Sequence, residues 1–77
     1  MKKFSIYPTV ANSQITIKDV EENALVSILN VSGQLVYQNV IANQEEIIDV
    51  SDFENGYYFM QTGTEENYAT TKFIVSK

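Results

Sequence analysis

The sequence predicts an all-β fold, an immunoglobulin-like β-sandwich built from about seven short antiparallel strands. Short runs rich in β-branched and aromatic residues recur along the chain, separated by polar or glycine-containing turns. Within most runs the apolar and polar side chains alternate, as they do in strands that bury one face. The chain is 77 residues long, which is the length of one domain. We therefore expect two sheets that pack face to face.

We expect residues 4–77 to form this domain and residues 1–3 to be linker or expression residues. Met1-Lys2-Lys3 resembles the start of a signal peptide, but the residues that follow supply no apolar segment of adequate length. No run is long enough to span a membrane as a helix.

The composition excludes several kinds of chemistry. Cysteine and histidine are absent, which excludes disulfides, metal sites built from these residues and thiol catalysis. Five lysines, no arginine and ten acidic residues give a net charge of −5, which disfavours binding to nucleic acid phosphates. The carboxylates lie mostly in connections, in a domain too small for a substantial pocket, so we expect no enzyme and no cofactor. A calcium site in one acidic loop is an alternative, although solvated turns explain the same residues more simply.

The first strand is expected at Phe4–Tyr7. Pro8 disfavours the α conformation at Tyr7 and cannot donate a hydrogen bond to a neighbouring strand, so this is an edge strand that stops there. Thr9–Ser13 is then a connection. Gln14–Lys18 is the second strand, with its isoleucines on one face.

A central hairpin is expected next. Asp19–Asn23 is a charged turn, and Ala24–Asn30 is an almost continuously apolar strand that suits a central position. Asn30 suits the first position of a type I turn, and Gly33 can take the left-handed conformation that closes a bulged hairpin. Leu35–Val40 returns antiparallel.

The fifth strand is expected at Glu45–Val50. Ser51–Glu54 resembles a helix capping box, but Gly56 follows too soon for more than one helical turn. Phe53 is therefore expected to close one end of the core.

The chain ends in a hairpin with strands Gly56–Thr62 and Tyr68–Val75, joined by a polar loop. Alternation places Tyr58 and Met60 on one face of the first strand, opposite Tyr57 and Phe59. In the second strand one face carries Ala69, Thr71, Phe73 and Val75, and the other carries Tyr68, Thr70, Lys72 and Ile74. The spacing of Tyr58 from Gly56 and Met60 predicts a tyrosine corner, in which the hydroxyl group bonds to upstream backbone.

Four short motifs follow one another along the chain. They are Tyr7-Pro8 followed by Gln14-Ile15-Thr16-Ile17; Val26-Ser27-Ile28-Leu29-Asn30-Val31-Ser32-Gly33-Gln34; Phe53-Glu54-Asn55-Gly56-Tyr57-Tyr58; and Thr71-Lys72-Phe73-Ile74-Val75-Ser76-Lys77. Together they resemble the C-terminal sorting domain, type A, of the bacterial type IX secretion system. Thr9 and Val10 depart from the family, which usually has Asn-Pro there.

The resemblance implies a non-catalytic secretion signal. In that family the cargo enters the periplasm, and its C-terminal sandwich is recognised by the outer-membrane translocon and shuttle proteins. A sortase-like cysteine protease usually removes the domain, and the cargo is anchored at the cell surface or released. The residues that carry recognition by resemblance are Gly56, Tyr58, Lys72, Phe73, Ile74, Val75 and Lys77. The residues that match structural motifs are Tyr7, Pro8, Asn30 and Gly33.

Two further expectations remain. The rival to a sorting signal is an adhesive or carbohydrate-binding sandwich module of a secreted enzyme, which requires an exposed aromatic platform. The exposed edge of the first strand also predicts weak homodimerisation or strand exchange at high concentration.

Overall fold

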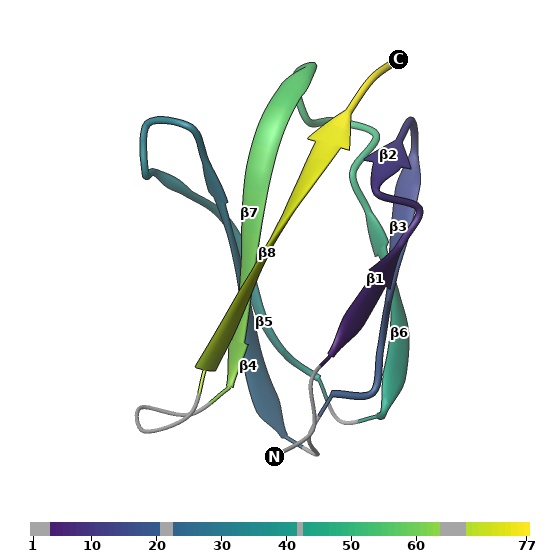
Figure 1. Cartoon of the computed structure of the whole chain (residues 1–77), viewed down its shortest axis with the longest axis vertical. Coiled ribbons are helices and arrows are strands. Elements are labelled where there is room, and N and C mark those ends of the chain that lie inside the picture. The colour runs from purple at the N-terminus through teal and green to yellow at the C-terminus, as the bar shows by residue number, and fades with distance from the viewer. Residues whose placement is uncertain (1–3, 21–22, 42, 64–67) are drawn as a thin grey trace.

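The structure, a computed structural model, describes residues 4–20, 23–41, 43–63 and 68–77, and it shows two β-sheets packed face to face (Figure 1). The predicted all-β sandwich is confirmed. The strands are β1 (Ser5–Tyr7), β2 (Val10–Ala11), β3 (Gln14–Lys18), β4 (Ala24–Asn30), β5 (Leu35–Ile41), β6 (Glu45–Asp49), β7 (Gly56–Gly63) and β8 (Tyr68–Val75). The described residues include no helix that could span a membrane.

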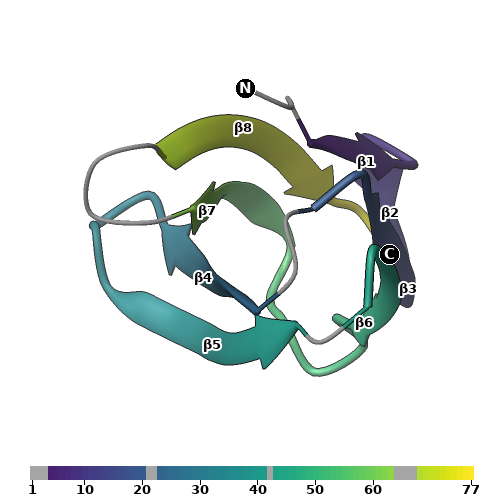
Figure 2. The same ribbon diagram turned by 90° about the horizontal axis from the view of Figure 1, so that it is seen from below.

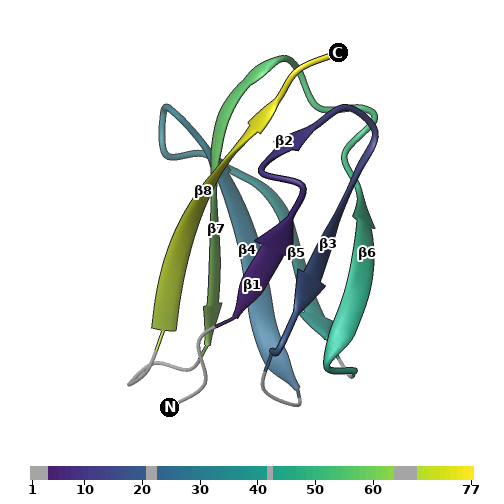
Figure 3. The same ribbon diagram turned by 45° about the vertical axis from the view of Figure 1, so that its right-hand side comes forward.

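The small sheet has the order β1-β3-β6, and both of its pairings are antiparallel. These strands lie side by side in Figure 3. Ile15 and Ile17 of β3 are fully buried, because the alternation of the strand turns both toward the large sheet. β1 forms an edge of this sheet and ends at Pro8, as the sequence predicts.

The large sheet has the order β2-β8-β7-β4-β5 (Figure 2). β4 lies between β7 and β5 and pairs antiparallel with both, which confirms its predicted central position. β7 and β8 form the predicted C-terminal hairpin, and Tyr58 pairs with Phe73 across it. The start of β1 and the end of β8 lie at opposite ends of the sandwich (Figure 1).

The prediction that Thr9–Ser13 is only a connection is wrong. Within it, Val10 and Ala11 form β2, which pairs parallel with Ile74 and Val75 of β8. The Ile74 amide donates to the Thr9 carbonyl oxygen at 2.9 Å, and the Ser76 amide donates to the Ala11 carbonyl oxygen at 2.8 Å. After Pro8 the chain leaves the small sheet and joins the edge of the large one. The two residues of β2 are too few to show the alternation that identifies a strand in a sequence.

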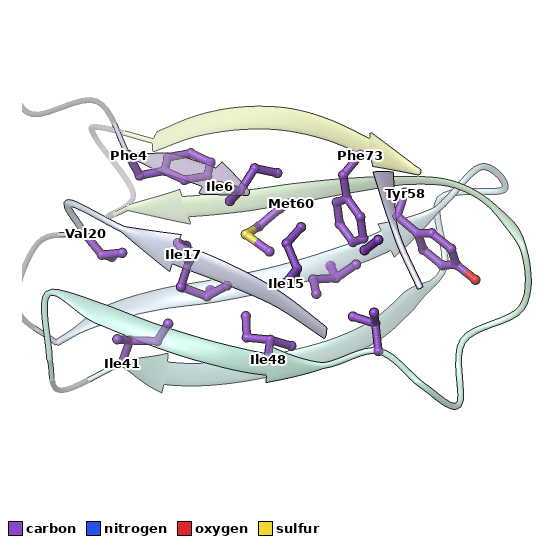
Figure 4. Packing of buried hydrophobic residues seen from close by; sticks show 14 of the residues in the cluster. Phe4, Ile6, Ile15, Ile17, Val20, Ile41, Ile48, Tyr58, Met60 and Phe73 are labelled. Atoms are coloured by element: carbon purple, nitrogen blue, oxygen red, sulfur yellow. The ribbon is translucent and has the colours of Figure 1, made fainter. Parts of the chain in front are cut away.

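The core lies between the sheets and draws on every strand (Figure 4). Its largest fully buried side chains include Phe73, Met60 and the isoleucines of β3 and β4. Phe53 is half-buried and packs against this cluster, which agrees with its predicted place at one end of the core.

The turn between β4 and β5 forms as predicted. The Gly33 amide donates to the Asn30 carbonyl oxygen at 3.0 Å, and Gly33 has a φ of 84°. The Asn30 side-chain oxygen accepts hydrogen bonds from the amides of Ser32 and Gln34, both at 3.0 Å. Asn30 thus closes the hairpin with its side chain, and Gly33 supplies the left-handed conformation.

Candidate recognition surface

Tyr58 forms the predicted tyrosine corner. Its hydroxyl group donates a hydrogen bond to the Glu54 carbonyl oxygen at 2.7 Å, while its ring is buried. Figure 4 shows the ring beside Phe73 and the hydroxyl group pointing away from the core. Gly56, between these partners, has a φ of 147° with open space around the position of a Cβ, so conformation rather than crowding favours glycine. Gly56 and Tyr58 therefore shape the chain between β6 and β7.

The Tyr58 ring connects that segment to the terminal strand. It lies 5.1 Å from the Phe53 ring and 5.6 Å from the Phe73 ring, measured between centroids. Burial raises the pKa of the Tyr58 hydroxyl, and the nearby Glu54 carboxylate raises it further. The raised pKa extends to more alkaline pH the range over which the hydroxyl group is neutral and can donate to the Glu54 carbonyl oxygen.

Lys77 contacts residues 51–55, in the connection between β6 and β7 that Tyr58 also contacts. The Lys77 ammonium donates to the Ser51 carbonyl oxygen at 2.5 Å and also to the Phe53 carbonyl oxygen. The Lys77 amide donates to the Asn55 side-chain oxygen at 3.0 Å. The ammonium is thus engaged within the domain. Sequence reasoning missed these acceptors, because two of them are backbone carbonyl groups and leave no trace in residue identity.

The terminal strand β8 presents its residues to opposite sides. Phe73 and Val75 are almost completely buried, so they contact the core. Lys72 is exposed and Ile74 half-buried, and both face outward. Of the predicted recognition residues in β8, only Lys72 and Ile74 are open to a partner of the folded domain; Phe73 and Val75 shape the strand from below.

Lys72 lies among aromatic side chains on the outer face of the large sheet. Its ammonium is 5.2 Å from the centroid of the Tyr57 ring, within the range of a cation–π interaction. Phe59 pairs with Lys72 across the hairpin, and Tyr57 pairs with Ile74. Sequence reasoning placed Tyr57 and Phe59 on the face opposite Tyr58 but did not assign them a role. The antiparallel register of β7 and β8 places Tyr57 beside Ile74 and Phe59 beside Lys72, which the sequence alone did not reveal.

Four of the tyrosines have side chains that the structure describes, and these four do not form one exposed platform. Tyr7 is exposed on the small sheet, where its hydroxyl group donates to the Glu45 carboxylate at 3.2 Å. Tyr57 lies on the large sheet, Tyr58 is in the core, and Tyr37 packs against the core. The aromatic neighbours on one outward face are Tyr57 and Phe59, so a carbohydrate-binding surface, which stacks a sugar on neighbouring aromatic faces, would have to be built on that pair.

The acidic connections that the structure describes gather no cluster either; Glu21, Glu22, Glu65 and Glu66 lie outside the described residues. The described residues contain no group of three or more carboxylates placed to hold a metal ion. Asp52 and Glu54 line an open hollow of about 460 Å³ beside Tyr58, together with Asn30 and Gln34 of the neighbouring hairpin. This hollow supplies no nucleophile and base in contact.

The profile of the secretion system C-terminal sorting domain family matches residues 5–76. The chain belongs to this family, the C-terminal sorting domains of type IX secretion. Members are in general non-catalytic. As a sorting signal, such a domain directs its protein to the outer-membrane surface or the extracellular space.

A solved structure shares the fold of this sorting domain. It is PorZ of Porphyromonas gingivalis, described as an essential bacterial surface component of the type-IX secretion system. The TM-score is 0.84 at 19% sequence identity, over 96% of this chain and 11% of the PorZ chain. The chain thus corresponds to a small part of that protein. No curated protein sequence matches it significantly.

Proposed function

We propose that this sorting domain carries a cargo protein from the periplasm through the type IX outer-membrane translocon. Translocon and shuttle proteins recognise the domain, and a sortase-like cysteine protease then removes it. The observation that carries the proposal is the family match over residues 5–76. The domain itself has no catalytic role and needs no cofactor.

The arrangement of the strands supports this role. Cargo that precedes the domain joins it before β1, at the end of the sandwich opposite the end of β8 (Figure 1). Only the end of β8, which carries Ile74, is therefore remote from the point of attachment, because β8 begins at the same end of the sandwich as β1 (Figure 1). A cargo joined before β1 leaves that end of the strand accessible.

Of the residues implied by resemblance, we assign direct recognition to Lys72 and Ile74. Gly56, Tyr58, Phe73, Val75 and Lys77 act by holding the strand that presents them. For Tyr58, Phe73 and Val75 this assignment follows from burial, since a partner can contact only side chains that the folded domain exposes. Lys77 is exposed, but its ammonium is already bonded to the Ser51 and Phe53 carbonyl oxygens, and Gly56 has no side chain to offer. This division also separates two ways in which a substitution can block export: by unfolding the domain or by removing a contact.

The proposal is tested with a periplasm-directed fluorescent protein fused to the N-terminus of the chain, in a bacterium that carries the type IX system. We expect the reporter at the surface or in the medium, with a mass that shows loss of the sorting domain. Export of the unfused reporter, or retention of the intact fusion in the periplasm, would overturn the proposal and favour a binding module. Export without loss of the domain would overturn proteolytic removal alone.

The substitution Lys72→Glu tests whether Lys72 contacts a partner directly or only helps the domain to fold. Lys72 is exposed, so its substitution should change the free energy of unfolding by no more than about 0.5 kcal/mol. Lys18→Gln, at an exposed lysine of the small sheet, is the control, because charge reversal there would set two carboxylates opposite each other at the Lys18–Glu45 pair. We expect Lys72→Glu to block export and Lys18→Gln to leave it intact, with little change in either melting temperature. Export with Lys72→Glu would show that this lysine is not read.

A further inference from the structure

The large sheet differs from the rest of the domain in its charge. Its five strands contain one residue that is charged at neutral pH, Lys72. The strands of the small sheet contain four such residues, Lys18, Glu45, Glu46 and Asp49. In a chain with ten acidic residues and five lysines, this difference leaves the outer face of the large sheet free of strand carboxylates.

Apolar side chains form a continuous band on that outer face. Leu35 of β5 pairs with Leu29 of β4, and Leu29 pairs with Phe59 of β7. Phe59 pairs in turn with Lys72 of β8. We call this band, with the neighbouring pair Tyr57 and Ile74, the outer band. It crosses the sheet from the β5 edge to β8, and Lys72 is its member on β8. Figure 2 shows the strands β5, β4, β7 and β8 in that order.

The outer band is exposed and has the composition of an interface. Leu35 is 53% exposed and Tyr57 49% exposed, while Leu29, Phe59 and Ile74 are half-buried. The centres of protein interfaces are depleted of charged residues and enriched in aromatic ones, and large exposed apolar patches mark binding sites. The outward face of a solvated antiparallel sheet is instead polar.

We propose that the outer band is the docking face for a secretion-machinery protein whose contact surface is apolar and carries an acidic side chain that pairs with Lys72. This inference rests on the proposed sorting function and deepens it. Charge complementarity identifies the acidic partner group, since Lys72 is the one charged residue within the described strands of this sheet and the partner must neutralise it when water is excluded. The Tyr57 ring holds the ammonium over the sheet, ready for that contact.

A second copy of the chain does not fit this face as well. Two copies joined through the outer band would bring two lysines into one interface, and the strands of the large sheet supply no carboxylate for either. The unpaired charges would oppose association. The occupant is therefore a different protein.

The apolar part of the inference is tested with Leu35→Asp in the reporter fusion. Ile47→Asp is the matched control, because Ile47 is an aliphatic residue, 60% exposed, on the edge strand β6 of the small sheet. We expect Leu35→Asp to slow export at least about tenfold, the scale of losing an interface anchor, and Ile47→Asp to leave it unchanged. The urea denaturation midpoints of the two purified variants should equal each other. Unfolding would then not explain why Leu35→Asp slows export and Ile47→Asp does not.

The acidic partner group is tested with Lys72→Arg, Lys72→Gln and Lys72→Glu in the same fusion. We expect export rates to fall in that order, with Arg near the unsubstituted level, because the charge is retained, then lost, then reversed. Equal export rates for the three variants would show that no acidic side chain of the partner pairs with Lys72.

Failure of this inference is distinguishable from failure of the sorting function. Retention of the unsubstituted fusion in the periplasm overturns the sorting function and the docking face with it. Export of the unsubstituted fusion together with undiminished export of Leu35→Asp overturns the docking face alone. Dimerisation that Leu35→Asp abolishes, with export unchanged, would show that a second copy occupies the face.

Discussion

The Lys77 ammonium donates a hydrogen bond to the Ser51 carbonyl oxygen, over 2.5 Å, and so joins the residue after β8 to the loop before β7. The same ammonium contacts the Phe53 carbonyl oxygen. Tyr58 holds the other part of this loop through the Glu54 carbonyl oxygen. Two side chains thus satisfy backbone oxygens of one short connection: Lys77 joins it to the end of β8, and Tyr58 joins it to β7.

Replacing Lys77 with methionine tests the first of these contacts. Lys77→Met keeps the length of the side chain and removes its donors, so the free energy of unfolding should fall by about 1 kcal/mol. The measurement is urea denaturation at neutral pH. Lys18→Met is the control, and we expect it to change stability by no more than about 0.5 kcal/mol. Equal, small effects of both substitutions would show that the Lys77 contacts do not stabilise the domain.

Substitution of Tyr58 tests the tyrosine corner. Tyr58→Phe removes the hydroxyl group that bonds to Glu54 and should cost about 1 kcal/mol. Tyr58→Ala also removes a ring packed between Phe53 and Phe73 and should cost at least about 3 kcal/mol. Denaturation midpoints of both variants measure these costs. Midpoints close to the unsubstituted value would contradict the buried position of Tyr58.

Alkaline pH provides an independent test of the same residue. The pKa of Tyr58 is raised above 10.0 in the folded domain, first by burial and then by Glu54. The folded state therefore retains this proton more strongly than the unfolded state, and the stability it contributes is full below a pH of about 10 and is lost as the pH rises through the folded pKa. The stability advantage over Tyr58→Phe should stay constant from a pH of about 8 to about 10 and shrink above it. A difference that stays constant above a pH of about 10 as well would contradict the raised pKa; the other tyrosines are present in both proteins and cancel.

The fold was predictable wherever alternation extended over a full strand. The apolar run of residues 24–30 predicted a central strand, and Asn30 with Gly33 predicted the turn after it. Both predictions depend only on residues that are close in the sequence. β2 was missed because Val10 and Ala11 are identified as a strand by their pairing with Ile74 and Val75, which are distant in the sequence. The candidate recognition surface was likewise predictable only where it depends on residues close in the sequence. The corner at Tyr58 could be predicted from spacing, whereas the acceptors of Lys77 are backbone oxygens that only the folded chain brings within reach.

Association of the isolated domain is a separate prediction. The strands at the edges of the two sheets present unpaired backbone groups, and β5 is the longest of them. We therefore propose weak homodimerisation or strand exchange at concentrations of about 1 mM. Light scattering over a dilution series measures it. A constant monomer mass up to that concentration would contradict it.

Transport of cargo through the type IX translocon by this sorting domain can be measured with one reporter fusion in two hosts that differ only in possession of that translocon. The fraction of fluorescence outside the periplasm is recorded in each. We expect export in the host with the translocon and retention in the periplasm of the host without it. Export from both hosts, or retention in both, would show that the domain does not direct cargo through this translocon.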